Sequence, residues 1–352
     1  MKYNLKGLYI EITSKCNLKC KHCYNNSGES IVDISVSSLE NLVIDAIGEG
    51  VKNFTISGGE PFTRADIVEI IKIILNNSST TLTIVTNAML ITNALLLEIK
   101  NCVNDIERIH FQISVDGFDE KSHDFLRGSG SFKILSSKLN IFKELGFKTS
   151  FHVVLHSGNY NDVERIIEYA KNYNVKKVEF TFLKKKGRTD LFYDQLLIKP
   201  QEERLLIEKF KQLTIDEKQV SFTHPQIFYG KCPLFEDDSS DMFARIDVYG
   251  NVYPCQNFDN KESIIGNINQ NKLKDIITET NMKKLYDRIL KKRMHDGLCN
   301  KCYVKNFCGK GCLGVEFCDD YNKNYSNDCL LRRECFFEEL NNLGTKLLKV
   351  KE

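Results

Sequence analysis

Six strand-like segments alternate with helix-like segments between residues 7 and 182, and this alternation restricts the fold more than any other feature. Runs such as "LYIEIT" (8–13) and "TLTIVT" (81–86) have the β-branched and aromatic character of strands. Segments such as "ADIVEIIKIILNN" (65–77) repeat apolar residues at helical spacing. Such alternation predicts a parallel sheet with helical crossovers. Periodicity alone fits an open doubly wound sheet or a partial barrel, and in both a ligand binds at the carboxyl ends of the strands.

Unusual residues follow the first four strands at that edge. Three cysteines in "CNLKCKHCY" (16–24) come directly after the first strand. The next three strands end in "SGGEP" (57–61), "TNAML" (86–90) and "SVDG" (114–117). We therefore expect these segments to meet in one site.

The chain holds 13 cysteines, an odd number. The N-terminus is too short and polar for a signal peptide and no run approaches a membrane span, so we expect a cytoplasmic protein. In that reducing compartment the cysteines predict metal or cluster ligation rather than disulfides. The net charge of +2 gives no reason to expect nucleic acid or a membrane surface as a partner.

The cysteines also divide the chain. Three precede residue 24, Cys102 is isolated on a helix and is expected to be buried without a ligand role, and nine lie from Cys232 onward. At 352 residues the chain exceeds the usual size of a single core. We predict a core at 1–195, a connecting helix and linker at 196–230, and a turn-rich, metal-dependent domain at 231–352 that has few apolar runs and closes with a short helix.

The first cysteine motif lacks an obvious fourth ligand. A zinc ion needs four ligands, and His22, adjacent to Cys23, is poorly placed to supply one. A four-iron cluster held by three thiolates instead leaves one iron open to an outside ligand. The spacing C-x3-C-x2-C resembles the motif of the radical S-adenosylmethionine (SAM) enzymes, with His22 at a position that is usually aromatic. This resemblance implies a partial (β/α)6 barrel with a SAM-binding [4Fe–4S] cluster on Cys16, Cys20 and Cys23.

The resemblance also implies which strand-end residues contact SAM. The "GGEP" turn would let backbone groups approach the charged cofactor, and Glu60 would accept from its ammonium group. Polar residues after the fourth strand would meet the ribose and the carboxylate. The alternatives are an ordinary turn, a polar strand end and, for Arg127, a solvated loop charge. The expected contacts are His22, Gly58, Gly59, Glu60, Ser114, Asp116 and Arg127.

A second group of cysteines includes "CNKCYVKNFCGKGC" (299–312), preceded by "YGNVYPC" (249–255). This order resembles the SPASM extension of radical SAM enzymes, which implies two auxiliary [4Fe–4S] clusters. By position, the proximal cluster would take Cys232, Cys255 and Cys312, with Cys318, Cys335 or no residue as the fourth ligand. The distal cluster would take Cys299, Cys302, Cys308 and Cys329. A pair of structural zinc sites is the alternative.

The resemblance implies an enzyme that cleaves SAM reductively to a 5′-deoxyadenosyl radical and removes hydrogen from a peptide or protein, for crosslinking (such as a thioether) or side-chain oxidation. It implies an external electron donor, a flavodoxin or ferredoxin. Gln256 stands where sulfatase-maturing members place a proposed aspartate base, which counts against that activity.

Other interpretations remain open from the sequence. The first strand begins near residue 7, so we expect leader binding to need a separate protein or to be absent. The same chemistry on a small molecule or tetrapyrrole in cofactor biosynthesis is the main alternative. A glycyl-radical-enzyme activase and a non-catalytic zinc-binding protein are disfavoured. No catalytic acid or base is assigned.

Overall fold

The computed structural model describes residues 3–216, 219–223, 232, 234–235, 241–295, 301–302, 312–318, 333, 336–337 and 340–341. Within these residues one sheet has the strand order β10-β9-β8-β1-β2-β3-β4-β5-β6-β7. The strands are β1 Asn4–Thr13, β2 Asn53–Gly58, β3 Thr81–Thr86, β4 Ile109–Ser114, β5 Lys148–Leu155, β6 Lys177–Phe182, β7 Val220–Thr223, β8 Asp241–Ile246, β9 Asn251–Tyr253 and β10 Gly266–Asn267.

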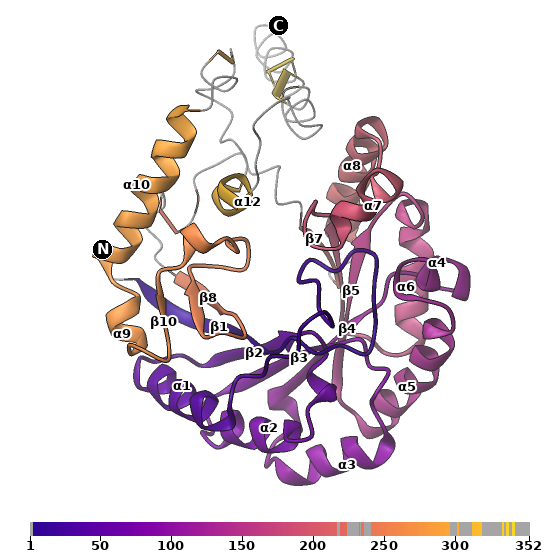
Figure 1. The fold of residues 1–352 in the computed structure, drawn as a ribbon. Helices are drawn as coiled ribbons and strands as arrows, with labels where there is room; N and C mark the ends of the chain where they lie inside the picture. Colours follow the sequence, from indigo (N-terminus) through magenta and orange to yellow (C-terminus); the bar gives the residue numbers. More distant parts are fainter. Residues whose placement is uncertain are drawn as a thin grey trace, which may run out of the picture.

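The helices that alternate with β1 to β6 follow the curved sheet on its outer side (Figure 1). The helices with described bounds are α1 Val36–Gly48, α2 Ile67–Leu75, α3 Asn93–Cys102, α4 Glu120–Arg127, α5 Ser131–Leu145, α6 Val163–Asn172, α7 Thr189–Leu196, α8 Pro200–Asp216, α9 Leu273–Ile276, α10 Glu279–His295 and α12 Leu313–Cys318. No helix among the described residues has the length and apolar character needed to span a membrane.

Strands β1 to β7 pair in chain order, each parallel to the next. A doubly wound sheet would reverse its strand order at a switch point, and this sheet does not. The partial barrel is therefore confirmed. One face of β2 to β5 carries fully buried residues such as Ile56, Ile84, Phe111 and Phe151, which belong to the continuous core.

The sheet extends beyond the six predicted strands at both ends. On one side β7 pairs with β6, and on the other β8 pairs with β1, both parallel. The antiparallel β9 and β10 then continue the sheet from β8. The sequence analysis missed β7 and β8 because both are short, with four and six residues, and because each lies far along the chain from its partner strand.

Helices α4, α7 and α10 were among those that the sequence analysis missed. Helix α4 has a polar sequence and depends on a capping box, in which Asp119 accepts from the Ser122 backbone N–H. Helix α7 is short, with eight residues. Helix α10 lies in the region expected to have few apolar runs, yet Met282, Leu285 and Ile289 pack fully buried. That expectation is wrong for this segment, and the predicted closing helix lies largely outside the described residues.

Candidate active site

The loop of residues 14–34, between β1 and α1 and called the cluster loop below, carries the first three cysteines. Burial raises the pKa of the Cys16 thiol to about 11, and the nearby Glu60, Cys20 and Cys23 add to this increase. Burial also raises the pKa of Cys20. The three thiols thus lie close enough to interact electrostatically. Bound metal ions stabilise the thiolate form of cysteine, so a metal cluster fits these three cysteines.

Two glycines allow the cluster loop to cross the end of β2. Gly59 donates its N–H to the Thr13 carbonyl at 2.7 Å, and Glu60 donates to the Lys15 carbonyl at 2.8 Å. A Cβ atom on Gly58 would lie 2.1 Å from the Thr13 oxygen, and one on Gly59 would lie 2.1 Å from the Lys15 oxygen. Only glycine permits this approach, so "GGEP" positions the cluster loop.

We expect Gly59→Ala to displace the cluster loop and to destabilise the fold by about 1–3 kcal/mol, the usual cost of overpacking. Urea unfolding and the iron content after reconstitution measure the two effects. Gly48→Ala is the matched control, because a Cβ there meets no atom within 4 Å. If the Gly59→Ala variant matched the Gly48→Ala variant in stability and iron content, the close approach of Gly59 to the Lys15 carbonyl would not position the cluster loop.

Glu60 joins the ends of β2 and β3. Its side chain is 1% exposed and accepts from Phe62 N at 3.2 Å, Thr86 Oγ1 at 2.7 Å and Asn87 N at 2.8 Å. Burial raises its pKa to about 7, and these hydrogen bonds oppose the increase. The Asn87 amide in turn donates to Asn17 Oδ1 of the cluster loop at 2.9 Å. An additional contact from Glu60 to a cofactor ammonium group stays a prediction.

Asp116, Arg127 and His22 come together although they are far apart in the sequence. Asp116 is 0% exposed, and its Oδ2 accepts from Arg127 Nε at 2.6 Å and lies 3.4 Å from His22 Nε2. Arg127 also donates to Cys20 Sγ at 3.9 Å. It ends α4 and is 8% exposed, so it is not a solvated loop charge. The pair is attached to the cluster loop through Cys20.

The charge states of this group follow from its surroundings. Burial alone would raise the pKa of Asp116, but the Arg127 guanidinium holds it well below its usual range. Burial lowers the pKa of His22 to about 3, so the imidazole is neutral at pH 7. Asp116 is therefore a buried carboxylate anion at pH 7. Its direct contact with a cofactor stays a prediction, as does that of the half-buried Ser114 at the end of β4.

The sequence analysis missed other residues that organise this group. His123 Nδ1 accepts from Asp116 N at 3.2 Å, and Asn159 Nδ2 donates to Asp116 O at 3.0 Å. Arg188, in "KKKGR", donates from its side chain to Cys20 O at 3.1 Å and is 9% exposed. An arginine just after the last predicted strand, at the ligand-binding edge of the sheet, was the available signal for Arg188.

Part of the second cysteine group also comes together. Burial raises the pKa of Cys255 to about 12, and the neighbouring Cys312 and Cys232 add to the increase. These three thiols make up the predicted proximal set. No three His, Cys, Asp or Glu side chains in the described part converge closely enough to hold a single metal ion.

Most of the predicted distal set lies outside the described residues. Cys302 is described and is partly buried, whereas Cys299, Cys308 and Cys329, and the candidate fourth ligand Cys335, lie outside the described residues. The other candidate, Cys318, ends α12.

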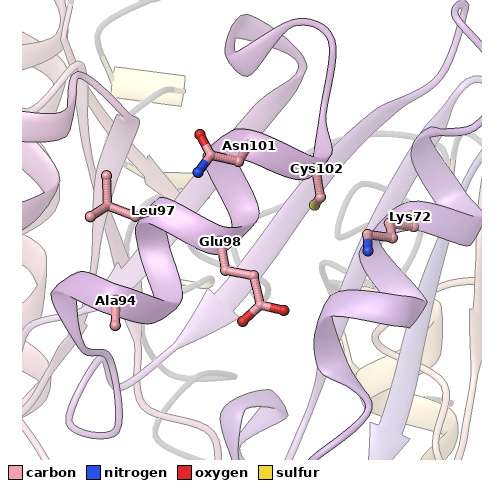
Figure 2. Close-up of a pocket in the computed structure, with 6 residues that line it drawn as sticks. All are labelled: Lys72, Ala94, Leu97, Glu98, Asn101 and Cys102. Atoms are coloured by element: carbon pink, nitrogen blue, oxygen red, sulfur yellow. The ribbon is translucent and has the colours of Figure 1, made fainter.

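Figure 2 shows the side chains that line a surface hollow between α2 and α3. The hollow has a volume of about 570 Å³. Its lining residues, which include Lys72, Glu98 and Cys102, belong to neither cysteine group. Cys102 is partly buried rather than fully buried as expected, and its Sγ donates to the Ile99 carbonyl at 3.1 Å. This hollow is therefore separate from the candidate active site.

Comparisons with known proteins match two parts of the chain to family models. Residues 10–170 match the model of the radical SAM superfamily, and residues 239–303 match the SPASM model of an iron–sulfur cluster-binding domain. The antilisterial bacteriocin subtilosin biosynthesis protein AlbA of Bacillus subtilis is 24% identical over 306 residues, 86% of this chain and 66% of AlbA. The AdoMet-dependent heme synthase of Methanosarcina barkeri is 25% identical over 183 residues, 51% of each chain. The chain thus spans about half to two thirds of these two relatives.

The fold is shared with solved structures. Streptococcus suis SuiB bound to its precursor peptide SuiA superimposes with a TM-score of 0.68 at 18% identity, over 90% of this chain and 74% of SuiB. Domains of the two matched kinds bind a [4Fe–4S] cluster with SAM and auxiliary iron–sulfur clusters, respectively. The chain therefore carries a radical SAM domain over residues 10–170 and a SPASM iron–sulfur cluster-binding domain over residues 239–303.

Proposed function

We propose that this protein is a radical SAM enzyme that modifies a peptide or protein substrate by crosslinking or side-chain oxidation. The observation that carries the proposal is the convergence of the Cys16, Cys20 and Cys23 loop with Glu60 and the Asp116–Arg127 pair at one edge of the barrel. When bound there, the cluster and SAM supply a 5′-deoxyadenosyl radical that removes a hydrogen atom from the substrate.

The residues of the chain hold these groups in place. The three cysteines would bind the first cluster, leaving one iron for SAM, and "GGEP" fixes the cluster loop so that backbone groups approach the cofactor. Arg127 carries positive charge to the Cys20 sulfur, and the buried Asp116 keeps the guanidinium in that position. Cys232, Cys255 and Cys312, with the described Cys302 and others of the second group, would bind auxiliary clusters.

The inward face of the barrel offers polar groups to a substrate. On β4 and β6, and over the second half of β5, half-buried residues alternate with buried ones. Gln112 Nε2 donates to Glu179 Oε2 at 3.2 Å, and Thr181 Oγ1 lies 3.3 Å from His152 Nε2. These side chains can accept or donate protons and hydrogen bonds along an extended substrate, which suits a peptide backbone.

AlbA is a bacteriocin biosynthesis protein, and its similarity to this chain extends over 86% of the chain. This similarity supports a peptide substrate. SuiB, which shares the fold, binds a precursor peptide. A tetrapyrrole is the second candidate, because the heme synthase is similar over 51% of the chain. We propose a flavodoxin or ferredoxin as electron donor and a separate protein for any leader binding.

The test uses the reconstituted chain under anaerobic conditions with SAM, dithionite and each small peptide encoded near its gene. We expect 5′-deoxyadenosine to form and one peptide to lose two hydrogens per crosslink, measured by mass spectrometry with fragmentation. Unmodified peptides together with a modified porphyrin in a parallel reaction would instead favour the tetrapyrrole.

A further inference from the structure

The segment of residues 184–188, "KKKGR", follows β6 and is fixed at one end on the cluster loop. Arg188 donates its backbone N–H to the Cys23 carbonyl at 2.8 Å. A Cβ on Gly187, which has φ +61°, would lie 2.4 Å from the Tyr24 carbonyl oxygen. This end of the segment is therefore packed backbone to backbone against the loop that carries the first three cysteines.

The other end of the segment reaches the second cysteine group. Lys184 Nζ donates to Asn257 Oδ1 at 2.6 Å, and Asn257 Nδ2 donates to Cys312 Sγ at 3.2 Å. Lys186 forms an ion pair with Asp259 in the same loop. One short segment thus connects the loops of both cysteine groups.

The lysine determines which way the amide of Asn257 faces. An ammonium group only donates, so the amide oxygen must face Lys184. The amide N–H2 is then directed at the Cys312 sulfur, where it is a donor to a ligand atom. Burial lowers the pKa of Lys184, and the neighbouring Cys312 and Cys255 oppose the decrease. The Lys184 amine therefore lies close to these sulfurs.

We propose that Lys184 and Asn257 are positioning residues of the auxiliary cluster site, where the lysine holds the amide so that it donates to the Cys312 sulfur and raises the cluster's reduction potential. The inference rests on the proposed function, because it requires an iron–sulfur cluster on Cys232, Cys255 and Cys312. Hydrogen bonds to ligand sulfurs and a nearby positive charge both stabilise the reduced, more negative state of such a cluster. The segment would set the potential at which this cluster exchanges electrons.

The experiment measures the potential of the auxiliary clusters directly. The full chain carrying Cys20→Ala, which removes a ligand of the first cluster, is reconstituted with iron and sulfide and titrated with dithionite, and the reduced clusters are followed by EPR. Asn257→Leu and Lys184→Met are added singly. We expect each to shift one auxiliary midpoint to more negative potential, with about a tenfold lower reduced-to-oxidised ratio at the original midpoint, or about 59 mV for one electron.

Lys185→Met is the matched control, because Lys185 is exposed and lies over the Tyr193 ring at 5.1 Å instead of facing Asn257. It should leave the midpoints unchanged, and Lys184→Arg, which keeps the charge, should restore most of the shift. Iron-loaded Asn257→Leu and Lys184→Met variants with unshifted midpoints would overturn the proposal. If the Asn257→Leu variant does not load iron, the midpoint of the Lys184→Met variant, which keeps the Asn257 amide, tests the proposal. An absence of auxiliary clusters from the parent chain would count against the proposed function instead.

Discussion

Cys20→Ala is expected to abolish the formation of 5′-deoxyadenosine from SAM in the presence of dithionite. Cys20 is 9% exposed, its sulfur faces Arg127, and its carbonyl is held by Arg188. Without Cys20, the described residues of the cluster loop offer only the thiolates of Cys16 and Cys23 to the first cluster. Liquid chromatography with mass spectrometry of the anaerobic reaction measures the product.

Cys102→Ala is the control for this substitution. Cys102 lies in the hollow between α2 and α3, belongs to neither cysteine group and is more exposed than Cys20. The Cys102→Ala variant should produce 5′-deoxyadenosine at the rate of the unaltered chain. Production retained by Cys20→Ala would refute the assignment of the first cluster.

Asp116→Leu is expected to lower the free energy of unfolding by about 3–5 kcal/mol, the usual cost of removing one partner from a buried ion pair. Asp116 is 0% exposed and Arg127 is 8% exposed, so the arginine would keep a buried charge with little access to water. The Val154 N–H, which donates to Asp116 Oδ1 at 2.8 Å, would also lose its acceptor. Urea unfolding followed by circular dichroism measures the change.

A double-mutant cycle separates the pair from its surroundings. The Asp116→Leu/Arg127→Leu variant should be more stable than the sum of the two single changes implies, because neither charge is then left unpaired. Strictly additive losses would show that the two side chains do not interact. Asp66→Leu is a suitable comparison, since its pair with Arg64 at 2.7 Å is partly exposed at the aspartate and should give a smaller loss.

The barrel could be predicted because the pattern of burial is visible in the sequence of β1 to β6. Strands such as β3, in which buried residues alternate with more exposed ones, are flanked by helices with apolar faces. In contrast, β8 joins the sheet only through its pairing with β1, which is more than 200 residues away in the sequence. A six-residue strand with an exposed Phe243 carries no local signal for a pairing at that distance.

The candidate site could also be predicted only in part. The three cysteines, "GGEP" and Asp116 stand at strand ends, where topology alone brings them together. Arg188 and Asn257 act through contacts to a backbone carbonyl or a sulfur of distant segments. No spacing rule encodes such contacts, so these residues became visible only once the loops were placed in three dimensions.

The most direct test of the central claim is the EPR spectrum and metal content of the anaerobically purified, reduced chain with and without SAM. We predict iron and sulfide in equal amounts, and a signal that depends on Cys16, Cys20 and Cys23 and changes when SAM is added. Zinc without iron, or a cluster signal that SAM leaves unaltered, would contradict the account.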